Sequence, residues 1–105
     1  MTTFDDRKNA FETKFAHDEE TRFKAVARRN RLLGLWAAGL LGKSGDEAAA
    51  YATEVVRADF QEAGDEDVVR KVAADLGGKA DVATIRAQMQ ACLAEAQRQL
   101  MDEAR

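Results

Sequence analysis

Apolar residues recur at steps of three and four along most of the chain, which is the spacing of one face of an α-helix. Glycine-containing breaks at 42–45, 63–65 and 77–78 interrupt this pattern. Short breaks of this kind join neighbouring antiparallel helices. The sequence therefore predicts an all-α fold, a compact four-helix bundle, whose later helices cover about 46–63, 65–76 and 82 onward.

Each predicted helix offers a stripe of side chains to a common core. The expected core positions are Phe23, Val26, Asn30, Leu33, Ala37 and Leu40; Ala48, Ala52, Val55, Val56 and Phe60; Val68, Val69, Val72, Ala73 and Leu76; and Val82, Ile85, Met89, Cys92, Leu93, Ala96 and Leu100. Residues 32–41 are apolar nearly all round, which predicts a central helix wrapped by the other three. Gly34 and Gly39 lie inside it and indicate either close approach of a neighbouring helix or a hinge.

Three residues are placed to begin helices. Ser44 has Glu47 three positions later, which is the spacing of a capping box. Asp65 and Asp81 directly precede the third and fourth apolar stripes, where an aspartate side chain accepts hydrogen bonds from the first backbone N–H groups. We expect all three to act as N-caps.

Composition narrows the functional classes. A chain of 105 residues forms one domain, and a net charge of −3 gives no reason to expect nucleic-acid binding. The single cysteine, Cys92, suits a reducing compartment. The N-terminus shows no apolar signal-peptide core, and the longest apolar run, 32–41, is too short to cross a bilayer. We therefore expect a cytoplasmic location without membrane insertion.

Residues 1–18 differ from residues 19–105, which already supply four core stripes. Their phenylalanines continue one helical stripe that ends on the first bundle helix: Phe4, Phe11, Phe15 and Phe23. A helix of this length is marginally stable or mobile on its own. The segment either folds back on the bundle, extends a long packed first helix, or presents phenylalanine anchors to a partner and folds as it binds.

A basic run follows, with no acid among its members. It comprises Arg22, Lys24, Arg28, Arg29 and Arg31. This run is either a solvated helix face or a charged docking surface for an acidic partner, because no base-stacking aromatics accompany it.

Signs of catalysis are weak. Gly42, Lys43 and Ser44 loosely fit a phosphate-binding loop, but that loop follows a strand and here a helix precedes it. Weak nucleotide binding at the next helix start remains an alternative. His17 is the only histidine and lacks further ligands for a metal, although it could sense pH, and Cys92 lies on an apolar face. We expect no enzyme activity, no metal and no cofactor.

Several strings are specific enough to name a family. They are FDDR at 4–7, AFE at 10–12, KFAHD at 14–18, ARRN at 27–30, LLGLWAA at 32–38, LGK at 41–43 and KVAADLGG at 71–78. Together they resemble the zeta-type inhibitor subunit of the alphaproteobacterial F-type ATP synthase, over essentially the whole chain.

The resemblance implies a four-helix bundle with an inhibitory N-terminal region. That region would insert as a helix at a catalytic interface of the soluble head of the synthase, near its catalytic subunits and central stalk, and block ATP hydrolysis. The matching stretch is 1–18, and its expected contact residues are Phe4, Arg7, Phe11, Lys14 and Phe15. The alternatives are a nucleotide-sensing helical module and a generic helical adaptor.

Overall fold

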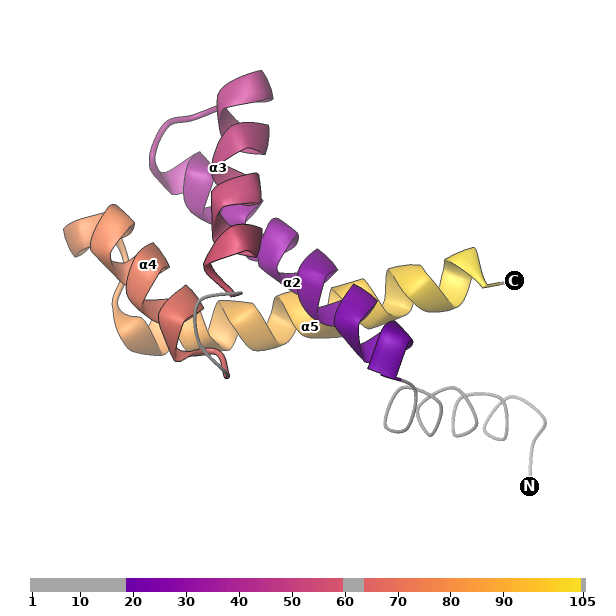
Figure 1. Ribbon diagram of the computed structural model, residues 1–105. Coiled ribbons are helices and arrows are strands. Elements are labelled where there is room, and N and C mark those ends of the chain that lie inside the picture. The colour runs from indigo at the N-terminus through magenta and orange to yellow at the C-terminus, as the bar shows by residue number, and fades with distance from the viewer. Residues whose placement is uncertain (1–18, 60–63, 105) are drawn as a thin grey trace.

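The computed structural model describes residues 19–59 and 64–104, and Figure 1 shows their arrangement. The elements are α2 (Glu19–Leu40), α3 (Gly45–Ala58), α4 (Glu66–Leu76), a single 3-10 turn η1 (Gly77–Lys79) and α5 (Val82–Glu103). No strand occurs in these two stretches. The all-α prediction with four helices is therefore confirmed.

The two longest helices, α2 and α5, organise the molecule. They cross each other, α3 turns back along the second half of α2, and α4 lies beside the start of α5 (Figure 1). Helix α2 contacts α3, α4 and α5, which confirms the prediction that it is the central helix. The start of α2 and the end of α5 lie on the same side of the molecule (Figure 1).

The core takes side chains from every helix. Its fully enclosed apolar members include Leu33, Ala37, Val55, Val68, Val72 and Ile85. Most of the predicted residues of α4 and α5 are buried, whereas Ala73, Leu93 and Leu100 are half-buried and Val82, which starts α5, is 45% exposed. The predicted position Phe60 lies outside the described residues.

The predicted face of α2 is partly wrong. Phe23 is 58% exposed and Leu40 is exposed as well, whereas Ala25 and Ala38 are buried. The buried face is rotated towards small residues because these allow the neighbouring helices to approach closely. Large apolar side chains at the two ends of α2 lie beyond that contact.

The two glycines inside α2 behave differently. A Cβ at Gly34 would lie 2.7 Å from Ala52 Cα, so α3 approaches α2 to within the space of a missing side chain. A Cβ at Gly39 would meet no atom within 4 Å. Close helix approach is confirmed at Gly34 and wrong at Gly39.

The predicted caps are only partly confirmed. Asp81 Oδ1 accepts a hydrogen bond of 2.7 Å from Thr84 N at the start of α5. Ser44 and Asp65 occupy the N-cap positions of α3 and α4, but neither side chain makes a capping hydrogen bond. Asp65 instead binds a side chain on α2, as described below.

Candidate docking surface

The basic run on α2 does not form one surface. Arg29 is buried, with 4% of its area exposed, and Arg28 is half-buried. Arg22, Lys24 and Arg31 are exposed. The interpretation of the run as one solvated face or one charged docking surface is therefore wrong for Arg29. Of the other members, Lys24, Arg28 and Arg31 line the groove described below, and Arg22 is not part of its lining.

Arg29 belongs to a buried polar cluster between α2 and the start of α4. Its Nε and Nη2 atoms donate to Asn30 Oδ1 at 3.0 and 2.9 Å, and Nη2 also donates to Asp65 Oδ1 at 2.9 Å. Burial has the largest effect on the Asp59 carboxyl and raises its pKa. The carboxylates of Asp65 and Asp67 raise this pKa as well, whereas Arg29 and Asn30 lower it. Asn30 Nδ2 is buried and has no hydrogen-bond partner among the described residues. The cluster holds the polar end of α3 and the start of α4 against α2.

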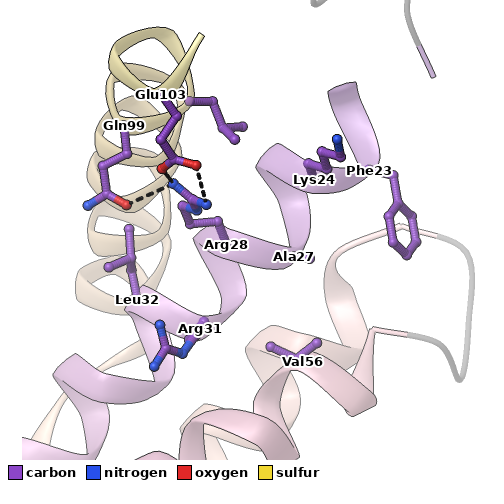
Figure 2. Close-up of a pocket in the computed structure, with 10 residues that line it drawn as sticks. Phe23, Lys24, Ala27, Arg28, Arg31, Leu32, Val56, Gln99 and Glu103 are labelled. Atoms are coloured by element: carbon purple, nitrogen blue, oxygen red, sulfur yellow. Dashed lines mark hydrogen bonds and ion pairs between the residues drawn. The ribbon is translucent and has the colours of Figure 1, made fainter. Parts of the chain in front are cut away.

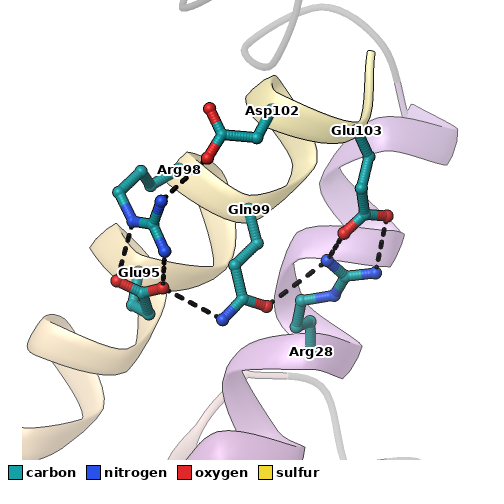
Figure 3. Close-up of polar contacts among 6 residues, drawn as sticks. All are labelled: Arg28, Glu95, Arg98, Gln99, Asp102 and Glu103. Carbon is teal, nitrogen blue, oxygen red and sulfur yellow. Dashed lines mark hydrogen bonds and ion pairs between the residues drawn. The ribbon is translucent and has the colours of Figure 1, made fainter. Parts of the chain in front are cut away.

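Arg28 joins α2 to the end of α5. Its guanidinium forms a two-pronged ion pair with the Glu103 carboxylate, with Nη2 at 3.0 Å from Oε1, and Nη1 donates to Gln99 Oε1 at 3.4 Å (Figure 3). The pair raises the pKa of Arg28 and lowers the pKa of Glu103, chiefly through the hydrogen bonds.

The network continues along α5. Gln99 Nε2 donates to Glu95 Oε2 at 3.0 Å, and Arg98 binds both Glu95 and Asp102 (Figure 3). Hydrogen bonds from Arg98 and Gln99 lower the pKa of Glu95 to about 2. Together these contacts hold the first half of α2 in a defined position on α5.

A groove of about 810 Å³ opens beside this ion pair. Helix α2 supplies six of its lining residues, the end of α5 supplies three and α3 supplies one, Val56 (Figure 2). The lining residues are Phe23, Lys24, Ala27, Arg28, Arg31, Leu32, Val56, Gln99, Leu100 and Glu103. The lining thus combines an apolar centre with three basic side chains and one acidic one.

The residues predicted to contact a partner all belong to residues 1–18. Phe4, Arg7, Phe11, Lys14 and Phe15 all lie outside the described residues, as does His17. Of the aromatic stripe, only Phe23 lies in the described part of the chain. The sequence prediction missed the groove because its walls come from segments more than 20 residues away along the chain.

The loop between α2 and α3 is occupied by helix-ending contacts. Gly42 N donates to Gly39 O at 3.2 Å and Lys43 N to Ala38 O at 2.9 Å. Gly42 has a positive φ of 77°, which glycine adopts without strain. A helix precedes this loop, as expected, and two of its backbone donors are already used to close α2.

Other chemical candidates are buried or absent within residues 19–59 and 64–104. There, no group of three His, Cys, Asp or Glu side chains could hold a metal ion. Cys92 is buried, as predicted, and burial raises the pKa of its thiol. None of the helices that the structure describes has the length and apolar character of a membrane span.

Comparison with known proteins identifies the family. A model of the ATPase inhibitor subunit zeta family matches residues 1–99. The chain belongs to this family. A chain known from a solution NMR structure is 63% identical to this member of the zeta family and superposes with a TM-score of 0.74. The match covers 78% of this chain and 96% of that chain, while a search of the curated proteins finds no match.

Proposed function

We propose that this protein inhibits ATP hydrolysis by an F-type ATP synthase by inserting residues 1–18, as a helix, at a catalytic interface of the soluble head. Membership of the ATPase inhibitor subunit zeta family is the observation that carries the proposal. The protein itself performs no catalysis. It acts in the cytoplasm, in keeping with its single cysteine.

The separation of the core from the N-terminal phenylalanine stripe supports this mechanism. Residues 19–59 and 64–104 build a core from all four helices, with Leu33, Val55 and Ile85 fully enclosed. The stripe of Phe4, Phe11 and Phe15 adds large apolar area outside those stretches. Buried aromatic anchors are typical of the few residues that dominate a protein interface.

The start of α2 is suited to serve as a handle. Arg28 fixes it to Glu103 and Gln99 of α5, so the bundle defines where the chain enters α2 at Glu19. A fixed point of attachment lowers the entropy lost when the neighbouring segment docks. Residues 19–105 would thus hold and aim the inhibitory segment.

Removal of residues 1–18 tests the proposal. The shortened protein should keep a cooperative thermal transition, because residues 19–59 and 64–104 together form a core with members from all four helices. It should lose inhibition of ATP hydrolysis by the purified soluble head. Inhibition equal to that of the full chain would refute N-terminal insertion. Loss of the thermal transition would favour the generic adaptor instead.

Single substitutions refine the test. Truncation of a docked phenylalanine, as in Phe11→Ala, should cost on the order of 2 kcal/mol of binding, or about thirtyfold in affinity for the head. Thr13→Ala is the matched control, because position 13 lies off the aromatic stripe on a helix. Its affinity should change less than about twofold, within the range of interface residues that contribute little. Arg7→Ala and Lys14→Ala test the two charged positions in the same way.

A further inference from the structure

We propose that the groove between α2, α3 and α5 is a second docking surface, which takes an acidic amphipathic helix on the surface of the soluble head. The occupant carries carboxylates that flank one or two large apolar side chains. The inference rests on the proposed function for the identity of the partner. The groove itself is defined by the described residues alone.

The shape of the groove suits a helix. Its lining positions on α2 run from Phe23 to Leu32, which is roughly 13 Å of helix or two and a half turns at 1.5 Å per residue. A groove between two helices, with Val56 of α3 at its other side, suits the apolar face of an amphipathic helix. The close-up shows Gln99 and Glu103 on one side of α2 and Val56 on the other (Figure 2).

The apolar part of the groove includes an exposed aromatic side chain. Phe23 is the most exposed of the large hydrophobic residues among the described stretches, at 58%. Ala27, Leu32 and Leu100 continue the apolar lining beyond it. An aromatic ring beside a groove of this size is a candidate interface anchor, because burying it removes much apolar area from water.

The charge of the groove favours an acidic occupant. Its lining holds three basic side chains and one acid, Glu103, whose carboxylate is already taken by Arg28. Arg31 is exposed and forms no ion pair within the described stretches. Lys24 meets Glu20 at 3.3 Å in an exposed i, i+4 pair, which is weak enough to exchange for a carboxylate of a partner. The groove is thus basic on a chain whose overall net charge is −3.

The position of the groove links it to the proposed inhibitory segment. Phe23 lies four residues after Glu19, where the chain enters α2 from residues 1–18. A head that has bound the segment would therefore lie next to the groove. A second contact on the same partner gains from the high effective concentration that the first contact creates.

Charge reversal in the full-length protein tests the groove. The affinity of Arg31→Glu for the purified soluble head should fall about tenfold, as expected when like charges replace a complementary pair. Lys79→Glu is the matched control, because Lys79 is exposed, forms no ion pair within the described residues and precedes the opposite end of α5. Its affinity should change less than about twofold. Raised salt should weaken the wild type more than Arg31→Glu, since salt screens the lost attraction.

A second pair of variants tests the apolar contact. Phe23→Ala should weaken binding about tenfold, whereas Val82→Ala, which truncates another exposed apolar residue far from the groove, should leave it unchanged within about twofold. Both should keep the wild-type thermal transition. At saturating protein, Phe23→Ala and Arg31→Glu should still inhibit ATP hydrolysis fully, because residues 1–18 are intact.

Several results would overturn the inference. Equal losses of affinity for Arg31→Glu and Lys79→Glu would show that the effect comes from the net charge of the protein and not from the groove. Tighter binding by Phe23→Ala and Arg31→Glu would mean that the chain's own residues fill the groove. A wild-type dimer that Arg31→Glu converts to a monomer in sedimentation, without loss of head binding, would assign the groove to a second copy. The proposed function is tested by a different experiment. It is wrong if the protein without residues 1–18 still inhibits ATP hydrolysis fully.

Discussion

The contact between α2 and α3 should tolerate no added carbon at Gly34. The Cβ of Gly34→Ala would lie 2.7 Å from Ala52 Cα and 3.2 Å from both Ala52 Cβ and Val55 Cγ2. Carbon atoms pack best at about 3.5–4.0 Å, so α3 would have to move away by roughly 1 Å. The closest atom belongs to a helix backbone, which cannot rotate aside as a side chain does.

The magnitude follows from two opposing effects. Overpacking a core contact costs about 1–3 kcal/mol, whereas replacing glycine by alanine in a helix stabilises it by about 1 kcal/mol. We expect Gly34→Ala to lower the free energy of unfolding by up to about 2 kcal/mol, or up to about 15 °C in Tm for a domain of this size. Gly39→Ala is the control: its Cβ would meet no atom within 4 Å, so it should raise Tm by a few degrees.

Thermal unfolding followed by circular dichroism at 222 nm measures both variants in one experiment. The helix-propensity gain is shared, so the difference between the two Tm values isolates the packing cost. A Gly34→Ala protein as stable as Gly39→Ala would refute the close contact between α2 and α3.

Three further predictions concern buried polar groups. Arg29→Ala should destabilise the fold by about 1–3 kcal/mol in chemical denaturation, because it leaves the buried Asn30 Oδ1 without its hydrogen-bond donor, whereas Arg22→Ala on the exposed face should have little effect. Burial, together with the hydrogen bond to Asp75, raises the pKa of Tyr51, the only tyrosine. The ultraviolet titration of Tyr51 in the folded protein should therefore begin well above pH 10. Stability should fall as the pH rises past 10, because the tyrosine of the unfolded chain ionises at a lower pH than that of the folded chain. The buried thiol of Cys92 should react with a thiol reagent far more slowly in the folded protein than in denaturant, and equal rates would contradict its burial.

The sequence pattern predicted the number and order of the helices because glycine breaks and apolar spacing are local signals. The packed face of α2 was harder to predict, since it depends on small residues such as Gly34 that carry little hydrophobic signal. Spacing alone placed Phe23 and Gly39 in close contacts, yet whether a neighbouring helix reaches them depends on the tertiary arrangement.

The candidate site shows the same limit. Nothing near Arg29 in the chain indicates that it is buried, because its carboxylate partner, Asp65, lies 36 positions later. The groove likewise needs α5 to lie beside α2, which no local pattern specifies. The family resemblance, in contrast, was visible from strings of consecutive residues, and the family match over residues 1–99 confirms it.

The ion pair between Arg28 and Glu103 joins two residues that lie 75 positions apart in the chain. Closing a loop of this length costs chain entropy that other contacts must first offset. The contact that fixes the start of α2 should therefore form late in folding, once the core has brought α2 and α5 together.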